Sequence, residues 1–468
     1  MITKNDEFVG IVDRLGVNGE GIIKNGDFIV FVPYVLPTEK VRYKILKVAK
    51  NFAYGKVLEV LVPADDRIRE VCPVFGKCGG CQLQHFKYSA QLKFKAQLVS
   101  DCFKKIAGLD VKVKSAVKSV QEYEYRNKLQ LPIGAVNGET QIGFFAENSH
   151  RIVPIKNCYI HPSWGQKVIS ALRIFMLKNK ISGYDDVTKT GLLRHIVCRE
   201  TDNSFIITLV STRAEIPHLD DFIEELKSCF INFSLYVNVN SDDTNVVFGD
   251  QFILKYGAPT YINDFLGLKY EVGVQSFMQV NTLVATKLYQ NAVKLLDPDE
   301  ETFVIDAYSG AGLMTAMFAK KAKCAFGIEI IPEAVNIANS LAKMNGLTDK
   351  MVNTCGDCAT VLPDLVKNLS EKGKVFVVLD PPRKGCDYSV LNAIKSCKID
   401  KIIYISCNPA TLARDVGLLT GSLHYEGNEI KKSTDYVPMY EVTSVQPYDM
   451  FAQTKHVETL VCLARKAD

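Results

Sequence analysis

One cysteine of this chain has the surroundings of a nucleophile. Cys407 stands in the tetrapeptide 406–409, Ser-Cys-Asn-Pro, after the apolar run 401–405 and before a helix that we predict over 410–414. A buried strand would fix the backbone that carries the thiol, and a nearby helix end favours its thiolate form. A structural cysteine in a turn has the same local pattern, so other parts of the chain must distinguish the two interpretations.

A thiolate that attacks a conjugated ring needs a base that removes a proton at a later step. Glu458, in the run His456-Val457-Glu458, stands at the start of a strand that we predict over 458–464. Its carboxylate could reach Cys407 if this strand lies beside the strand that leads to the cysteine. The sequence does not give that distance.

Two segments predict a nucleoside pocket. Residues 306–312, Asp-Ala-Tyr-Ser-Gly-Ala-Gly, follow an apolar strand, and their glycines let the backbone approach a ligand closely. Glu329 ends the next predicted strand, where an acid can accept both hydroxyl groups of a ribose. Because the sequence has neither the GxGxxG pattern of NAD enzymes nor a Walker P-loop, we expect S-adenosylmethionine as the ligand. An ordinary turn between a strand and a helix is the alternative.

A third segment, 380–385, has the sequence Asp-Pro-Pro-Arg-Lys-Gly and follows an apolar strand. The two prolines restrict the loop and would aim the carboxylate of Asp380. Ligands of parallel sheets bind at the carboxyl ends of the strands, so this position favours a role in the site over a plain turn.

Three cysteines lie within ten residues, with the spacing Cys72-x5-Cys78-x2-Cys81. Three thiols so close together are poorly suited to disulfide pairing, and they predict a metal site for which Cys158 is the best fourth ligand. Four thiolates suit zinc or a [4Fe–4S] cluster, and the spacing does not choose between them. Buried cysteines without a shared role are the alternative.

Composition limits the classes of function. No run of 18 apolar residues occurs, so we expect no membrane span, and residues 1–7 lack the apolar core of a signal peptide. We therefore expect a cytoplasmic protein, in which the 14 cysteines stay reduced and serve metal binding, catalysis or packing. The net charge of +4 permits nucleic-acid binding without requiring it.

Basic residues outnumber acids between residues 93 and 128, and Tyr123 and Tyr125 lie in this stretch. Cations with interspersed aromatics suit a polyanion that exposes its bases. A solvated helix face is the alternative.

Three regions must position these residues. Residues 1–62 read as five short strands (8–12, 21–23, 27–33, 40–48 and 53–62) with a hairpin at Asn25-Gly26, which predicts a small β-barrel. Residues 63–270 contain the four cysteines of the predicted metal site and a helix over 88–106. The rest of this region reads as a mixed α+β domain with strands at 128–133, 141–145, 196–199, 204–211 and 234–239. We expect the helix near 88–110 to pack on the last region.

The last region, 271–468, begins with a predicted helix over 276–296 and then alternates strands and helices. The strands are predicted at 303–306, 325–330, 375–380 and 401–405, and the helices at 313–321 and 332–345. This order predicts an α/β domain with a parallel, doubly wound sheet, and its ligands would bind at the carboxyl ends of the strands.

Together, these residues resemble the RNA uracil-5-methyltransferase family, and in particular its 23S rRNA (uracil-5-)-methyltransferase branch. The similarity covers nearly the whole chain. Residues 1–62 look like the OB-like TRAM barrel that binds RNA in this family, with Gly19-Glu20-Gly21 and Val32-Pro33 in place. Pro37-Thr38-Glu39 stands where Pro-Gly-Glu is usual. The resemblance implies a Rossmann-like, S-adenosylmethionine-dependent methyltransferase domain.

The resemblance also implies roles for single residues. Cys407 matches the family's nucleophile and Glu458 its base. The cofactor contacts would be Gln279, Tyr308, Glu329 and Asp380, and the [4Fe–4S] ligands would be Cys72, Cys78, Cys81 and Cys158. Leu313 stands where related enzymes often carry asparagine, which puts that cofactor contact in doubt.

The activity implied is methylation of uracil C5 in 23S ribosomal RNA through a Cys–C6 adduct, giving 5-methyluridine on a flipped uridine. We expect a monomer that does not bind a membrane. The candidates for RNA contact are Arg126, Lys128, Arg194 and His195, with a place in the core or in a surface salt bridge as the alternative for each. A tRNA uracil-5-methyltransferase and a non-catalytic RNA-binding or ribosome-assembly factor are the alternatives. An amino-group methyltransferase that uses the Asp-Pro-Pro loop is disfavoured, because its loop ends in an aromatic residue and Arg383 follows here.

Overall fold

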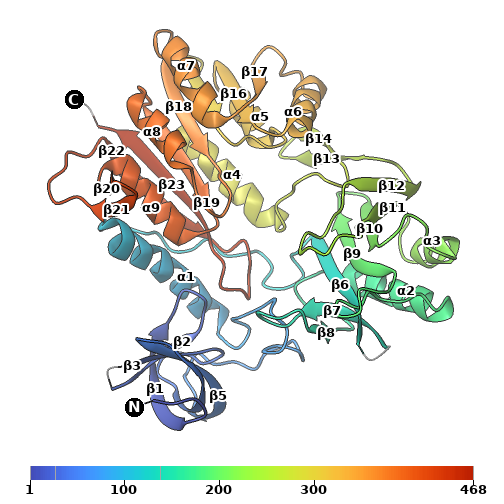
Figure 1. The fold of residues 1–468 in the computed structure, drawn as a ribbon. Helices are drawn as coiled ribbons and strands as arrows, with labels where there is room; N and C mark the ends of the chain where they lie inside the picture. Colours follow the sequence, from blue (N-terminus) through green and yellow to red (C-terminus); the bar gives the residue numbers. More distant parts are fainter. Residues whose placement is uncertain (1, 27, 137–138, 467–468) are drawn as a thin grey trace.

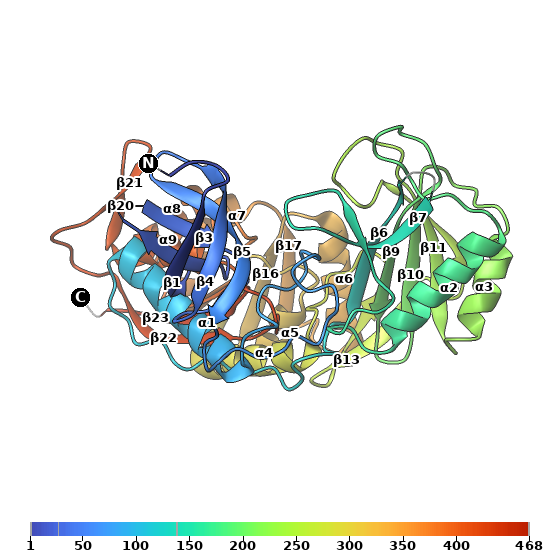
Figure 2. The same ribbon diagram turned by 90° about the horizontal axis from the view of Figure 1, so that it is seen from below.

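The computed structural model describes residues 2–26, 28–136 and 139–466. Figures 1 and 2 show a barrel at the N-terminus, a central sheet to one side, and a large C-terminal sheet, with the long helix α1 between the barrel and the C-terminal sheet. No helix within those three ranges is long and apolar enough to cross a membrane.

The N-terminal region forms the closed five-stranded barrel that the sequence predicts, with the strand order β1-β2-β3-β5-β4. Its strands are β1 (Glu7–Leu15), β2 (Gly21–Asn25), β3 (Phe28–Val32), β4 (Lys40–Val48) and β5 (Phe52–Val62). Alternate side chains such as Val12, Val30 and Val41 fill the interior, as the two-residue period of a strand requires. Asp27, the first residue of the predicted third strand, lies outside the described residues.

Helix α1 (Tyr88–Cys102) continues into a π-helical turn, η1 (Phe103–Ala107), which ends at Gly108 with a positive φ of 69°. These two elements together match the helix predicted over 88–106. They contact the C-terminal helix α9 (Pro409–Thr420), and Val99, Cys102 and Phe103 belong to the same hydrophobic core as α9.

The central region is a seven-stranded sheet with the order β12-β11-β10-β9-β6-β7-β8. Its strands are β6 (Lys128–Val136), β7 (Glu139–Phe145), β8 (Ile152–Pro154), β9 (Leu193–Glu200), β10 (Phe205–Ser211), β11 (Phe233–Val239) and β12 (Gln251–Tyr256). Helices α2 (Trp164–Lys178) and α3 (Leu219–Lys227) lie side by side on this sheet (Figure 2). The hairpin β13 (Tyr261–Phe265) and β14 (Leu268–Val272) leads on to the C-terminal region.

The C-terminal region is a seven-stranded sheet with the order β17-β16-β15-β18-β19-β23-β22. Its strands are β15 (Thr302–Asp306), β16 (Cys324–Glu329), β17 (Met351–Cys355), β18 (Lys374–Leu379), β19 (Lys401–Ser406), β22 (Tyr440–Tyr448) and β23 (Glu458–Arg465). The first five of these in sheet order are parallel, whereas β23 and β22 are antiparallel to their neighbours. The strands predicted at 303–306, 325–330, 375–380 and 401–405 are parallel, as expected. Two antiparallel strands, β23 and β22, extend the sheet, and a loop instead of a helix connects them.

Helices cover both faces of this sheet. The helices are α4 (Thr282–Leu296), α5 (Leu313–Ala319), α6 (Pro332–Met344), α7 (Cys358–Ser370), α8 (Tyr388–Ser396) and α9. Helices α7, α8 and α9 pack into one hydrophobic core, and α4, α5 and α6 pack into the core on the opposite face. A small hairpin, β20 (Leu423–Glu426) and β21 (Glu429–Lys432), follows α9.

The helix predicted over 276–296 begins six residues later, at Thr282. Asn281 has extended backbone angles, and its side chain accepts a hydrogen bond from the N–H of Val284, so it caps the helix. Residues 276–280 are consequently a loop, and several of them reach the cavity described next.

Candidate active site and cysteine centre

A cavity of about 490 Å³ opens at the carboxyl ends of the C-terminal strands. Strand β15 lies between β16 and β18, so the order of the strands reverses at its edge, which is where ligands of doubly wound sheets bind. Among the lining residues are Gln279, Tyr308, Asp380, Cys407 and Glu458. The structure thus brings together five residues that the sequence singled out from five separate segments.

The strand register sets the relation between Cys407 and Glu458. Strands β19 and β23 are antiparallel neighbours, and Ser406 pairs with Thr459 at the last position of the ladder. Cys407 and Glu458 are the next residues on their respective strands, so both open into the cavity from adjacent backbones. The condition set by the sequence, that the last strand lies beside the strand leading to Cys407, is fulfilled.

Three carboxyl groups that line the cavity, those of Asp306, Asp380 and Glu458, have raised pKa values. Burial raises the pKa of Asp306 to about 6, and burial together with Asp306 raises the pKa of Asp380 to about 7. Burial raises the pKa of Glu458 well above its ordinary value, and Asp380 adds to this effect. A carboxylate in such surroundings has a strong tendency to take up a proton.

Arg383 lies beside the thiol of Cys407. Burial and the Glu458 carboxylate raise the pKa of the thiol, and the Arg383 guanidinium opposes them by lowering it. The carbonyl oxygen of Arg383 accepts hydrogen bonds from Asn408 Nδ2 (3.2 Å) and Thr411 Oγ1 (3.3 Å). The loop after β18 is therefore fixed to the start of α9, next to Cys407.

Not all of the residues expected at the cofactor line the main cavity. Gln279, Tyr308 and Leu313 line the cavity, and the neighbouring Gly312 has a φ of +81°, which favours glycine. Glu329 is not among the lining residues. Its carboxylate accepts hydrogen bonds from the N–H groups of Gly310 (3.0 Å) and Ile331 (2.9 Å), so it is held at the edge of the glycine loop.

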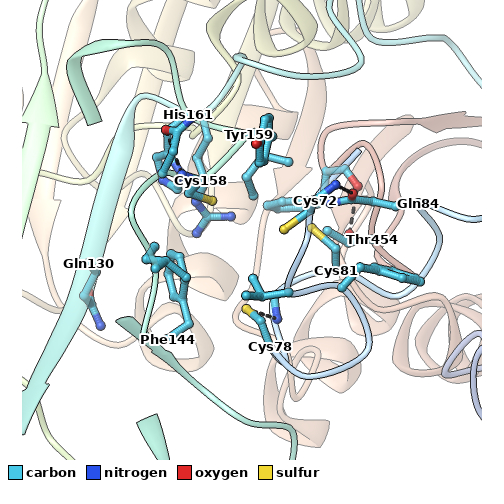
Figure 3. Close-up of a pocket in the computed structure, with 18 of the residues that line it drawn as sticks. Cys72, Cys78, Cys81, Gln84, Gln130, Phe144, Cys158, Tyr159, His161 and Thr454 are labelled. Carbon is cyan, nitrogen blue, oxygen red and sulfur yellow. Dashed lines mark hydrogen bonds between the residues drawn. The ribbon is translucent and has the colours of Figure 1, made fainter. Parts of the chain in front are cut away.

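The four cysteines predicted as metal ligands line a second cavity, of about 360 Å³. Figure 3 shows the sulfur of Cys158 on one side of this space and those of Cys72 and Cys81 on the other, with Cys78 below them. Burial, together with the neighbouring thiols of Cys78 and Cys72, raises the pKa of the Cys81 thiol to about 12. In the part of the chain described, no group of three or more His, Cys, Asp or Glu side chains is arranged to hold a single metal ion.

The two cavities are neighbours, because Arg383 and Phe451 line both of them. Phe451 belongs to the loop that joins β22 to β23. A buried ion pair anchors this loop to α1: Lys95 Nζ lies 2.5 Å from Asp449 Oδ1 and also donates to the Phe451 carbonyl oxygen at 3.1 Å. Tyr88 donates to the other oxygen of Asp449 at 2.7 Å.

The four residues considered for RNA contact fall into two places. Arg126 and Lys128 line the cysteine cavity. Arg194 and His195 line a separate cavity of about 390 Å³ in the central region. Arg194 donates to the carbonyl oxygens of Asn240 (2.9 Å) and Asp242 (2.7 Å), so its guanidinium holds a loop.

Sequence reasoning missed several residues of the site. No function was assigned to Arg383 from the sequence. Its position directly after the Asp-Pro-Pro segment is the feature that could have indicated one. Tyr289 on α4 and Phe451 also line the main cavity. Nothing in their local sequence distinguishes them from residues of a hydrophobic core.

Comparison with known proteins gives matches to RNA methyltransferases. Residues 362–466 match a family model described as tRNA (uracil-5-)-methyltransferase, and residues 301–406 match one described as RNA cap guanine-N2 methyltransferase. A protein of Clostridium acetobutylicum described as an uncharacterized RNA methyltransferase is 38% identical, over 99% of this chain and 98% of its own. One of Listeria innocua with the same description is 36% identical, over 100% of this chain and 99% of its own.

Among solved structures, the Pyrococcus abyssi tRNA (uracil-54, C5)-methyltransferase, in complex with S-adenosyl-L-homocysteine, matches with a TM-score of 0.74. The match covers 97% of this chain and 99% of the other at 23% sequence identity, and it shows that the two share a fold. With two full-length relatives above one-third identity, and with a family model over the segment that holds Cys407 and Glu458, this chain belongs to the RNA uracil-5-methyltransferase family.

Proposed function

We propose that this protein methylates C5 of uracil in 23S ribosomal RNA with S-adenosylmethionine, and that it forms 5-methyluridine through a covalent bond between Cys407 and C6. One observation carries the proposal. The thiol of Cys407 and the carboxylate of Glu458 open from adjacent strands into the cavity that also contains Gln279, Tyr308 and Asp380.

Cys407 would act first. C5 of uracil is a poor nucleophile, and addition of the thiolate to C6 moves the electrons of the C5–C6 double bond toward C5 and the C4 carbonyl oxygen. The resulting enolate can attack an electrophilic methyl group. Covalent catalysis of this kind divides one difficult step into easier ones. Arg383 would favour the thiolate, since its guanidinium lowers the pKa of the buried thiol.

Glu458 would act second. After methylation, C5 carries both the new methyl group and a proton, and the carboxylate removes that proton. The electron pair of the C–H bond then forms the C5–C6 double bond again, and the thiolate leaves C6. General base catalysis contributes roughly 10²–10⁴-fold in rate. Burial raises the pKa of Glu458 and so strengthens its carboxylate as a base.

S-adenosylmethionine would supply the electrophilic methyl group. The residues of the main cavity fit this molecule, because the cavity lies at the strand-order reversal and combines polar side chains with a glycine loop. Gln279, Tyr308 and Asp380 would hold it, with Glu329 close to its ribose. Asp380 would also orient the uracil or the methyl donor.

A [4Fe–4S] cluster held by Cys72, Cys78, Cys81 and Cys158 is part of the proposal. The four thiols share one cavity but are not arranged for a single ion, and zinc would need all of its thiolates about 2.3 Å from one point. A cluster gives each thiolate its own iron and so suits thiols that are farther apart. A brown protein with iron and sulfide supports this assignment, whereas a colourless protein with stoichiometric zinc would reverse it.

The target uridine must leave its stack to enter the cavity, at a cost of a few kcal/mol. Contacts between RNA and the N-terminal barrel, the basic stretch 93–128 and the central region would offset this cost. The resemblance to the 23S rRNA branch favours rRNA as the substrate. Transfer RNA is the second candidate, because the solved structure that matches 97% of this chain is that of a tRNA methyltransferase.

The experiment that tests the proposal has two parts. Purified protein is incubated with labelled S-adenosylmethionine and either 23S rRNA or tRNA transcripts, and 5-methyluridine is mapped in RNA from a strain that lacks the protein. We expect methylation of 23S rRNA and loss of the corresponding 5-methyluridine from the strain. Methylation of tRNA alone would transfer the assignment to the second candidate, and no methylation of uracil in either RNA would refute the activity.

A further inference from the structure

The turn that carries Cys158 is bound to a segment of the central region that contains no cysteine. In this segment, the N–H of Glu124 donates to the Tyr159 carbonyl at 3.0 Å, and the N–H of Arg126 donates to the Ile160 carbonyl at 2.9 Å. A third bond joins His161 Nε2 to the Lys128 carbonyl at 2.9 Å. Three hydrogen bonds therefore join residues 158–161 to residues 124–128.

The same segment also holds the loop that faces the main cavity. Asn127 is buried, and its Nδ2 donates to the carbonyl oxygen of Gln279 (2.9 Å) and to Thr282 Oγ1 (3.2 Å). The N–H of Asn127 donates to the Val280 carbonyl at 3.0 Å. One asparagine thus binds two backbone carbonyls before Asn281, which caps helix α4, and the side-chain hydroxyl of the residue after it.

Asn127 touches neither cavity itself. It is absent from the residues that line the main cavity and from those that line the cysteine cavity. Its neighbours in the chain, Arg126 and Lys128, line the cysteine cavity, and its partner Gln279 lines the main one. Asn127 therefore lies between the two cavities and is bound to residues that line each of them.

We propose that Asn127 is a positioning residue that couples the cysteine centre to the cofactor cavity. A group bound by the thiols fixes the turn 158–161, this turn fixes 124–128, and Asn127 then holds Gln279 in the orientation that binds S-adenosylmethionine. The inference rests on the proposed function, because it takes the main cavity as the cofactor site. It assigns to the cysteine centre a measurable effect on cofactor affinity, without any electron transfer to the substrate.

A thermodynamic cycle tests this coupling. The wild type, Cys158→Ala, Asn127→Asp and the double variant are purified, their iron and sulfide are measured, and the Kd of S-adenosylhomocysteine is determined by calorimetry. Cys158→Ala should lose the centre and weaken binding by about fivefold or more. Asn127→Asp should keep its iron and weaken binding by a similar factor. The double variant should bind no more weakly than Asn127→Asp alone, because both changes break the same connection.

Asn238→Asp is the matched control. Asn238 is buried on β11 of the central sheet, and its Nδ2 donates to the carbonyl oxygens of Gly249 (2.8 Å) and Gln251 (3.0 Å). This change removes the same kind of hydrogen bonds at a site that lines neither cavity. It should reduce the Tm about as much as Asn127→Asp and leave the Kd of S-adenosylhomocysteine unchanged.

The outcomes separate this inference from the proposed function. Additive effects in the double variant, an unchanged Kd in Cys158→Ala, or equal weakening in Asn238→Asp would each overturn the coupling. If Cys158→Ala does not fold, chelation and oxidation of the wild-type centre provide the unloaded form for the same measurement. Failure of the wild type to bind S-adenosylhomocysteine would overturn the cofactor site and the coupling together.

Discussion

Cys407 and Glu458 occupy matching positions at the ends of two antiparallel strands, one residue beyond the last paired residues, Ser406 and Thr459. Their proximity has an electrostatic consequence, because the Glu458 carboxylate raises the pKa of the Cys407 thiol. Rigid strands keep the two groups in a fixed relation, which suits side chains that act on the same ring at successive steps.

Glu458→Gln should trap the covalent intermediate. Glutamine retains the size of the side chain but cannot accept the C5 proton, so the thiolate cannot leave C6. We expect turnover to fall by about 10²–10⁴-fold, the range for loss of a general base. A protein–RNA band that resists denaturation should accumulate on a gel when labelled RNA and S-adenosylmethionine are present.

Glu333→Gln is the control for this experiment, because Glu333 is exposed in the first turn of α6. Its turnover should equal that of the wild type, and no persistent band should form. Rapid turnover by Glu458→Gln, without a trapped band, would rule out Glu458 as the base.

Cys407→Ala should abolish methylation while leaving RNA binding intact. The variant lacks the nucleophile that activates C5, but it retains the barrel, the basic stretch and the shape of the cavity. Turnover is measured with labelled S-adenosylmethionine and RNA affinity by filter binding. Cys355→Ala, at an exposed cysteine that ends β17, should behave as the wild type in both assays. Methylation by Cys407→Ala near the wild-type rate would contradict the covalent mechanism.

The parts of the site that could be predicted from the sequence are those that depend on local pattern, and the parts that could not be predicted depend on contacts between distant segments. The segments of Tyr308, Asp380 and Cys407 each follow an apolar strand, and parallel strands bring their carboxyl ends to one edge of a sheet. Glu458 could be located only conditionally, because the pairing of β23 with β19 is an antiparallel contact between strands separated by about fifty residues that local pattern does not encode. The start of α4 was wrong for a related reason, since the apolar residues of 276–280 face a cavity instead of continuing a helix.

The cysteine centre illustrates the same limit. The spacing of Cys72, Cys78 and Cys81 predicts three ligands and leaves Cys158 as the best fourth candidate. Local pattern does not encode the hydrogen bonds that connect residues 124–128 with the turn 158–161 and with Gln279, because they join three distant segments. The position of Arg383 beside Cys407 likewise depends on hydrogen bonds between the loop after β18 and the start of α9, which local pattern does not encode.

Arg383→Met should make Cys407 less reactive at neutral pH. The guanidinium lowers the pKa of this thiol, against burial and Glu458, so its removal should raise the pKa and reduce the fraction of thiolate. The rate of alkylation of Cys407 by iodoacetamide, followed by peptide mass spectrometry across a pH series, measures this shift. Alkylation of the exposed Cys355 in the same samples serves as the internal reference. A midpoint that stays unchanged or moves to lower pH would exclude Arg383 as the group that favours the thiolate.

Asp380→Asn should change how stability depends on pH in the absence of cofactor. The pKa of Asp380 is raised from 3.8 to about 7 by burial and by Asp306, so between these values the folded protein retains a proton that the unfolded chain has released. Under this condition the free energy of unfolding falls as pH rises from about 4 to about 7. The variant lacks this titration, so its stability should decline less over the same range.

Above pH 7, Asp380→Asn should also be more stable than the wild type, by on the order of a few kcal/mol, because it buries no charge at this position. Urea unfolding at a series of pH values measures both effects, and Asp364→Asn, at an exposed position on α7, should retain the wild-type slope. Some slope should persist in Asp380→Asn, since burial also raises the pKa of Asp306, to about 6. Parallel stability curves for the wild type and Asp380→Asn would mean that Asp380 is already ionised at low pH in the folded protein, and its carboxylate would then carry a full negative charge beside the substrate throughout the working range.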